Sequence, residues 1–255
     1  MNVFSCRVVR SRPVADSIFV LRFRSPEIAA TIRAGQFLNI RVGEGSEPLL
    51  RRPFSVYRVE GEDLEIVFSV IGRGTTELAK KREGDLMDVL GPLGVPFVVS
   101  DRSYDVALLV AGGLGIAPLP ILTRDLLKER KSIRTFVGAR SKKHLVTDYL
   151  QDVHVATDDG SMGFHGTVVD MLRDNLARAQ FARPKIFACG PTAMLRSLAE
   201  VARSQNIPCE VSLEGSMACG FGICQGCPVE LTEGPTRYAL MCKDGPTFDI
   251  RRIKI

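Results

Sequence analysis

The feature that most constrains this chain is a group of cysteines near its carboxyl end. Four of the seven cysteines follow the pattern C-x4-C-x2-C-x14-C, at Cys219, Cys224, Cys227 and Cys242. Four thiolates brought together by a short loop can hold a soft metal centre, and this spacing with a distant fourth cysteine is typical of plant-type [2Fe–2S] clusters. The intervening glycines would let the backbone wrap closely around such a cluster. The pattern therefore predicts electron transfer.

Two other roles for these cysteines stay open from the residues alone. A structural zinc site usually has two C-x2-C pairs, whereas here one gap spans four residues and the last cysteine stands apart. Disulfides would require an oxidising compartment, and the amino-terminal segment lacks the continuous apolar run of a signal peptide. We therefore expect a cytoplasmic protein with reduced cysteines, in which Cys6 and Cys209 are buried strand residues.

Composition narrows the classes of function. The chain has 255 residues, 45% hydrophobic and 25% charged, which is enough for two medium domains and a small appendix. Its net charge of +5 is scattered, and no run of Lys and Arg interleaved with aromatic residues occurs, so nucleic acid binding is not expected. The apolar run at residues 106–122 is shorter than the ~20 residues of a membrane helix and is interrupted by glycine and proline. We expect no membrane span.

The first part of the chain, residues 1–98, has an all-β pattern. Short and roughly alternating segments separated by turns predict six strands, at residues 4–9, 18–23, 37–42, 54–59, 64–70 and 86–90. Six such strands suit a small closed antiparallel barrel. Only residues 75–82 in this part are expected to be helical, with Thr75 or Thr76 as the N-cap.

From residue 99 to 214 strands alternate with helices, which predicts βαβ units and a parallel sheet. Residues 215–255 show little periodicity and contain the cysteine pattern. Such a short segment needs a metal centre as its core. We therefore expect three domains: a barrel, an α/β domain and a small cluster domain.

Two segments of the barrel suit a phosphorylated cofactor. The run Arg51-Arg52-Pro53-Phe54-Ser55 offers guanidinium groups, a stiff bend and a hydroxyl at the start of a strand. A glycine-rich turn at residues 72–76 then opens the expected helix with free backbone N–H groups, which suits a pyrophosphate. Each segment alone could be an ordinary turn, but together they predict a flavin nucleotide on the barrel.

Two loops of the α/β domain suit a nicotinamide dinucleotide. Gly112, Gly113 and Gly115 follow an apolar strand and precede a helix, although they do not form the G-x-G-x-x-G fingerprint. The second loop, at residues 189–191, also lies between a strand and a helix, and therefore at the same carboxyl edge of the sheet. Its Cys189 could be a core thiol or could face the nicotinamide.

Two polar segments follow neighbouring strands. The basic residues 140–143 lie where a 2′-phosphate of NADP would be held, although they could equally be an exposed helix start. Asp158 and Asp159 are expected to form a turn rather than a catalytic group.

With these motifs in this order, the chain resembles the ferredoxin–NADP reductase superfamily over residues 1–215. The segments at residues 212–214, 217–220, 224–227 and 242–246 make it similar to the electron transfer subunits of type 1B dihydroorotate dehydrogenases. The second resemblance covers essentially the whole chain.

The resemblance implies specific ligands. One [2Fe–2S] cluster would be bound by the four cysteines of the pattern. FAD would be bound by Arg52, Pro53, Phe54, Ser55, Val67, Phe68, Ser69, Gly74 and Thr75. NAD, as a substrate, would be bound at Gly112, Gly113, Gly115, Cys189, Gly190 and Pro191.

The resemblance also implies a separate catalytic subunit with FMN, in a heterotetramer of two copies of each chain. Electrons from dihydroorotate would pass from that FMN through the cluster and FAD to NAD⁺, so this chain would lack the base that deprotonates dihydroorotate. Phe221, Ile223 and Gln225 are expected at the partner interface. The alternative is an NAD(P)H-dependent reductase subunit that serves ferredoxin, sulfur or hydrogenase, and a zinc-stabilised binding module is a third hypothesis.

Overall fold

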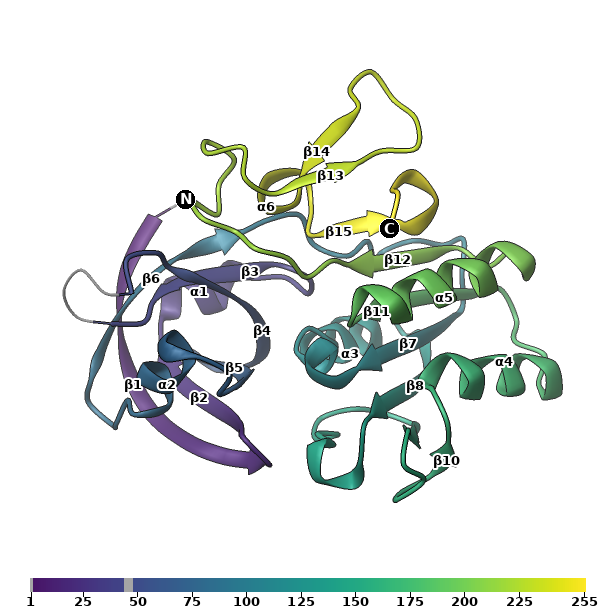
Figure 1. The fold of residues 1–255 in the computed structure, drawn as a ribbon, viewed down its shortest axis with the longest axis horizontal. Coiled ribbons are helices and arrows are strands. Elements are labelled where there is room, and N and C mark those ends of the chain that lie inside the picture. Colours follow the sequence, from purple (N-terminus) through teal and green to yellow (C-terminus); the bar gives the residue numbers. More distant parts are fainter. Residues whose placement is uncertain (1, 44–47) are drawn as a thin grey trace.

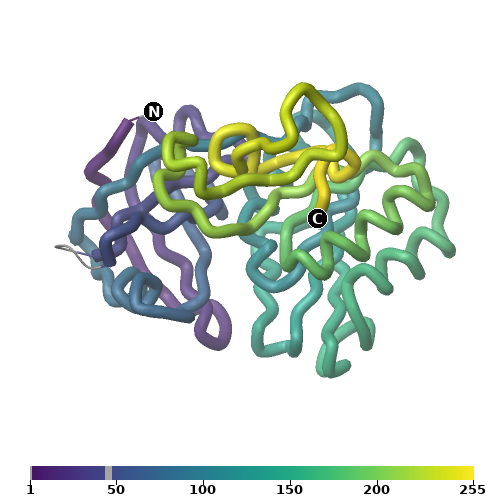
Figure 2. The backbone as a smooth tube through the Cα atoms, turned by 45° about the horizontal axis from the view of Figure 1, so that its top comes forward, coloured from purple at the N-terminus to yellow at the C-terminus, as the bar shows by residue number. Residues whose placement is uncertain are grey.

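The computed structural model describes residues 2–43 and 48–255 (Figure 1). A β-barrel lies beside an α/β sheet, and the carboxyl-terminal segment runs across both (Figure 2). No helix in the described part of the chain is long and apolar enough to cross a membrane.

The barrel consists of six antiparallel strands and is closed, in the order β1-β2-β5-β4-β3-β6. Its interior is filled by apolar side chains such as Leu21, Phe23 and Ile66, which are inaccessible to solvent. The strands are β1 (Asn2–Ala15), β2 (Ile18–Arg24), β3 (Phe37–Arg41), β4 (Arg52–Glu60), β5 (Asp63–Ser69) and β6 (Leu86–Leu93). The expected six-stranded barrel is confirmed.

The barrel part contains two helices, so the expectation of a single one is wrong. The additional helix, α1 (Pro26–Thr31), begins at a proline and packs Ile28 completely into the core. It is too short to show a clear helical period in the sequence. The expected helix is α2 (Arg73–Ala79), and it begins after Gly72 rather than after a threonine. Thr75 instead accepts a hydrogen bond from the Gly72 amide over 3.3 Å.

The second part is a seven-stranded sheet in the order β10-β9-β8-β7-β11-β12-β15. All neighbours are parallel except the last pair, as the βαβ pattern predicts. The strands are β7 (Val106–Gly112), β8 (Ser132–Ala139), β9 (Val153–Thr157), β10 (Phe164–His165), β11 (Pro184–Cys189), β12 (Cys209–Ser212) and β15 (Thr247–Asp249).

Helices cover both faces of this sheet (Figure 1). On the face toward the barrel, α3 (Leu119–Lys128) contacts β4. On the other face, α4 (Val168–Arg178) and α5 (Thr192–Ser204) pack against each other. Short 3₁₀ turns lie at η1 (Gly113–Ile116) and η2 (Lys142–His144). Gly112 ends β7, and Gly113 and Gly115 lie in η1, so these glycines are at the carboxyl edge of β7, where ligands of such sheets bind.

The carboxyl-terminal segment contains a small hairpin and then returns to the sheet. Its hairpin strands are β13 (Pro228–Glu230) and β14 (Tyr238–Leu240), followed by α6 (Met241–Asp244). The next strand, β15, pairs antiparallel with β12, and η3 (Ile250–Arg252) follows it. The segment therefore shares the α/β sheet as well as carrying its own hairpin.

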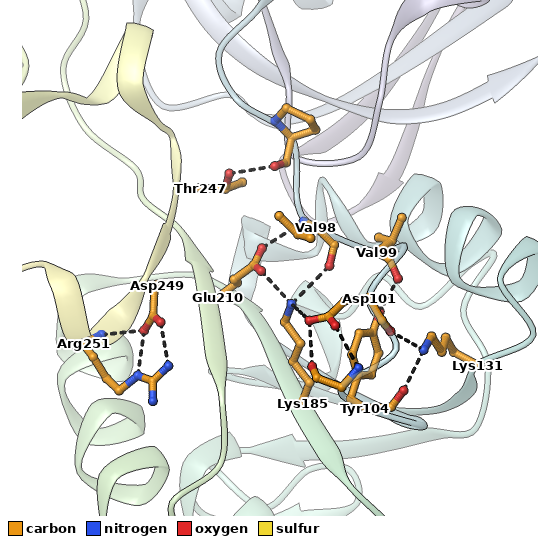
Figure 3. A network of polar contacts seen from close by, with 12 residues as sticks. Val98, Val99, Asp101, Tyr104, Lys131, Lys185, Glu210, Thr247, Asp249 and Arg251 are labelled. Atoms are coloured by element: carbon orange, nitrogen blue, oxygen red, sulfur yellow. Dashed lines mark hydrogen bonds and ion pairs between the residues drawn. The ribbon is translucent and has the colours of Figure 1, made fainter.

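A buried ion pair joins the barrel linker to the sheet (Figure 3). The Nζ of Lys185, on β11, lies 2.7 Å from Glu210 Oε1 on β12 and donates to the Val98 carbonyl over 3.1 Å. Glu210 in turn accepts from the Val98 amide over 3.0 Å. The hydroxyl of Thr247, on β15, donates to the Val95 carbonyl over 2.8 Å. The chain that leaves the barrel is thus fixed to both other parts.

Candidate functional site

The first candidate site is a cavity of about 380 Å³ between the barrel and the sheet. Most of the residues predicted for FAD line it: Pro53, Phe54, Ser55, Val67, Phe68, Ser69 and Thr75. Its opposite wall comes from Leu114 and Ala117 near η1 and from the segment of Glu214 to Met217. All three parts of the chain therefore contribute to one cavity.

The remaining two residues predicted for FAD, Arg52 and Gly74, lie together beside this cavity. A Cβ atom on Gly74 would lie 3.5 Å from the Nε of Arg52, so the glycine lets the guanidinium rest against the first turn of α2. Positive charge at this position suits a pyrophosphate. The rings of Phe54 and Phe68 meet edge to face, with centroids 5.9 Å apart, and form an apolar wall suited to a flavin ring.

A second cavity, of about 360 Å³, lies at the carboxyl edge of the sheet. The predicted residues Gly112, Gly113 and Pro191 line it, together with Arg140 and Asp158. The sequence predicts Asp158 as part of a turn, and its side chain also lines this cavity. An acidic and a basic side chain at the rim of a nucleotide cavity can both contact ribose or phosphate groups.

Gly115, which was predicted to bind the dinucleotide, does not line this cavity. It lies instead where the first glycine-rich loop packs against the loop at residues 189–191. A Cβ atom on Gly115 would lie 2.0 Å from the Cys189 carbonyl oxygen, so only glycine fits there. Gly190 also lies close to the first loop, since a Cβ atom on it would lie 3.0 Å from the Gly112 nitrogen. The two loops that were predicted separately are therefore in direct contact.

Cys189 is buried at the end of β11 and lines neither cavity. Its thiol donates to Glu214 Oε1 over 3.7 Å, and Glu214 lines the flavin cavity. Burial raises the pKa of the Cys189 thiol far above its usual range, and burial also raises the pKa of the Glu214 carboxyl. Glu214 was not among the predicted site residues, because residues 212–214 contributed to the family resemblance without any ligand role for the glutamate.

The four cysteines of the pattern lie as two pairs. The sulfurs of Cys227 and Cys242 are 3.2 Å apart, and the Cys224 side chain lies close enough to Cys219 to lower the pKa of its thiol. Within the described ranges, no three His, Cys, Asp or Glu side chains lie together as a single metal-binding group. Two pairs of thiolates suit a centre with two irons, each of which takes two cysteines.

The electrostatics of the loop favour thiolates. Burial acts to raise the pKa of Cys219, but hydrogen bonds from the backbone amides of Cys224, Phe221 and Ile223 outweigh it and hold that pKa at about 6. Such N–H···S bonds are the contacts that tune an iron–sulfur centre. Cys242 has the opposite environment, because burial and the neighbouring Cys227 sulfur raise its pKa to about 12. A cation bound between the pairs would offset the repulsion of the sulfurs.

The backbone of the loop needs glycine where it meets the barrel. Gly220 has a φ of +84°, and a Cβ atom there would lie 2.5 Å from the side-chain nitrogen of Asn39, on β3. That nitrogen donates to the Cys219 carbonyl over 3.1 Å. The barrel therefore contacts the cysteine loop directly, while Cys224 on the far side of the loop is exposed.

A closed barrel, a parallel nucleotide sheet and a cysteine loop define a modular reductase of the ferredoxin–NADP reductase type. Residues 214–254 match the family described as the iron–sulfur cluster binding domain of dihydroorotate dehydrogenase B. The NAD(+) dihydroorotate dehydrogenase B electron transfer subunits of Desulforamulus reducens and Bacillus pumilus are each 35% identical, covering 97% of this chain and 96% of theirs. The chain belongs to this family of electron transfer subunits.

Solved structures agree with this assignment. The NADH-dependent reduced ferredoxin-NADP oxidoreductase superimposes with a TM-score of 0.86 at 31% identity, covering 98% of this chain and 89% of that one. Phthalate dioxygenase reductase, at 19% identity, shows the same fold with a TM-score of 0.65, covering 98% and 78%. The family and the fold class expected from the sequence are confirmed, as are the cofactor types FAD, iron–sulfur cluster and NAD. The individual ligand residues stay predictions.

Proposed function

We propose that this chain connects an FMN-containing dihydroorotate dehydrogenase catalytic subunit to NAD⁺ in pyrimidine biosynthesis, in a cytoplasmic heterotetramer of two copies of each chain. The observation that carries the proposal is the flavin cavity, which ends at Met217, two residues before the first cysteine of the loop. When bound, a [2Fe–2S] cluster supplies one-electron transfer, and FAD couples these single electrons to the two-electron chemistry of a nicotinamide.

The residues of the barrel would bind and orient the flavin. Arg52 beside α2 would neutralise the pyrophosphate, and the Ser55 hydroxyl and the Phe54 ring would fix the isoalloxazine in the cavity. On the sheet side, Gly112, Gly113 and Pro191 would support the dinucleotide. Buried and neutral, the Cys189 thiol would add no charge close to the transferred hydride.

The cysteine loop would hold the cluster at the protein surface. Cys219, Cys224, Cys227 and Cys242 would hold the cluster as its four thiolate ligands. Around them Ile223 is 76% exposed and Gln225 is exposed, whereas Phe221 is half-buried. An exposed aliphatic side chain next to a cluster ligand suits a partner interface. The three parts of the chain, residues 1–98, 99–214 and 215–255, would thus hold FAD, NAD and the cluster respectively.

Coexpression with a catalytic subunit tests this proposal. We expect the two chains to copurify with FMN, FAD and iron, and an Ile223→Glu variant to lose the catalytic chain while keeping its own flavin and iron. Leu127→Glu, at an exposed aliphatic position on α3, is the matched control and should copurify normally. Copurification of Ile223→Glu at the wild-type level would contradict the proposed interface.

A second candidate function is a reductase subunit that uses NADPH. Arg140 lines the dinucleotide cavity, where a guanidinium suits a 2′-phosphate, and one structural relative acts between NADH, ferredoxin and NADP. Flavin reduction by NADH and by NADPH, each measured by stopped flow, separates the two functions. Faster reduction by NADPH, abolished in Arg140→Gln, would favour the alternative.

A further inference from the structure

A third cavity, of about 370 Å³, lies on the outer face of the barrel, where the loop after β8 meets it. It shares no lining residue with the flavin cavity or the dinucleotide cavity. Its polar lining consists of four arginines, one glutamate and one tyrosine: Arg10, Arg12, Arg22, Arg58, Glu65 and Tyr149. No part of the electron-transfer function described above uses these residues.

Two of the four guanidinium groups are held in place by the protein. Arg22 lies 2.7 Å from Glu60 and 2.9 Å from Asp63. Arg58 lies 2.6 Å from Glu60, and its guanidinium carbon sits 4.0 Å from the centre of the Tyr149 ring. These pairs fix the walls of the cavity and connect the barrel to the sheet domain through Tyr149.

The other two guanidinium groups have no such partners. Neither the Arg10 nor the Arg12 side chain makes a hydrogen bond or an ion pair with any residue of the described ranges 2–43 and 48–255. Both come from β1, with side chains on the same side of that strand since they are two residues apart. Adjacent guanidinium groups of this kind bind phosphate oxygens through paired, charge-assisted hydrogen bonds.

Glu65 is a second group of this cavity that lacks a partner, and it needs a hydrogen-bond donor. Only 6% of this residue is exposed, and its Oε1 lies 3.9 Å from both Arg22 and Arg58. Its Oε2 is buried without a hydrogen-bond partner. A buried carboxylate oxygen left without a donor is costly, so a hydroxyl or amino group in the cavity would stabilise it.

We propose that this cavity binds a small organic phosphate that also carries a hydrogen-bond donor, such as a sugar phosphate. The phosphate group contacts Arg10 and Arg12, and a hydroxyl donates to the Oε2 of Glu65. Because Tyr149 closes the cavity from the sheet domain, the bound molecule bridges the barrel and the sheet domain. The proposal does not depend on the identity of the partner subunit.

Calorimetric titration of the flavin- and cluster-loaded chain with ribose 5-phosphate, in saturating NAD⁺, tests the site. We expect binding that weakens about tenfold or more in Arg10→Gln/Arg12→Gln, since two charge-assisted contacts are lost. Arg24→Gln, an exposed arginine on the same barrel, is the matched control and should bind like wild type. Equal affinity in the double variant, or no binding to the wild type at millimolar concentrations, would overturn the proposal.

A parallel titration with inorganic phosphate tests the contact with Arg10 and Arg12 separately from the contact with Glu65. We expect Glu65→Gln to weaken ribose 5-phosphate several-fold and to leave inorganic phosphate unchanged or tighter, because only the sugar donates to this oxygen. Displacement of ribose 5-phosphate by NAD⁺, or the same response of both ligands to Glu65→Gln, would contradict the assignment. The flavin and cluster absorbance of each variant confirms that it is folded.

Discussion

The side-chain nitrogen of Asn39, on barrel strand β3, donates a hydrogen bond to the backbone carbonyl of Cys219 over 3.1 Å. Asn39 is completely buried, and 180 residues separate the two partners in the sequence. The flavin barrel therefore fixes the position of the first cysteine of the loop. Since electron transfer requires closely spaced centres, this contact ties the geometry of the cluster loop to that of the flavin cavity.

Asn39→Ala should weaken the cluster loop. The change leaves the Cys219 carbonyl without its donor, at a cost of about 1–3 kcal/mol. We expect normal flavin content but faster loss of cluster absorbance in air. Gln36→Ala removes a similar side-chain hydrogen bond, to the Gly94 carbonyl over 2.9 Å, and serves as the control. Equal cluster lifetimes in the two variants would show that the Asn39 contact is unimportant.

Gly220→Ala should impair the cluster more than an equally strained change elsewhere. Alanine at this φ of +84° costs about 1–2 kcal/mol, and its Cβ would also collide with Asn39. Gly84→Ala is the control. Gly84 has a φ of +90° and open space around it, so alanine there has only the backbone cost and no collision. We expect Gly84→Ala to keep full iron content and Gly220→Ala to lose most of it, as measured by iron analysis. Matching iron contents would count against the tight loop geometry.

Lys185→Met should destabilise the whole chain. It leaves the largely buried carboxylate of Glu210, only 15% exposed, without its cation, and breaking a buried pair costs about 3–5 kcal/mol. Lys80→Met removes an exposed pair with Glu77, at 2.8 Å, and should cost less than about 1 kcal/mol. Urea unfolding midpoints of the flavin-loaded variants give the comparison. Similar midpoints would mean that the network of Figure 3 contributes little.

Glu214→Gln should alter the pH dependence of stability. Burial raises the pKa of this carboxyl in the folded chain, so the folded state binds its proton more tightly than the unfolded state. The stability linked to this group is present below the unfolded pKa and is lost as pH rises through the folded value. Glutamine cannot ionise, so the variant should gain stability over wild type between pH 5 and pH 8.

Melting temperatures of the flavin-loaded chain at both pH values check this, with the exposed Glu233→Gln as the control. A constant difference between Glu214→Gln and wild type across this range would exclude Glu214 as the titrating group.

Much of the architecture follows from local pattern. Alternating strands predicted the barrel, and strand–glycine–helix segments predicted the parallel sheet, because burial imposes its period directly on the residues. The sequence did not reveal α1 or the antiparallel strand β15. Each is very short, and β15 forms only because β12 offers it an edge. Contacts between distant segments leave no local period.

In the candidate sites, too, features with a local sequence pattern were predicted and contacts between distant residues were not. Cysteine spacing and the glycine loops were visible as patterns, whereas the roles of Glu214 and Asn39 were not. Both act through partners that are remote in the sequence, Cys189 and Cys219 respectively. The arginine cavity was also missed, because its residues come from four strands and a loop and are single charges in otherwise ordinary segments.

The central claim is that the four cysteines carry electrons between a catalytic subunit and the flavin of this chain. Its most direct test is NADH formation from dihydroorotate and NAD⁺ by the reconstituted complex, comparing Cys227→Ser with the buried Cys209→Ser control. We predict that Cys227→Ser loses dihydroorotate-dependent NADH formation but still reduces ferricyanide with NADH through its FAD, and that Cys209→Ser keeps both activities. Undiminished NADH formation by Cys227→Ser, with no iron bound, would contradict the claim.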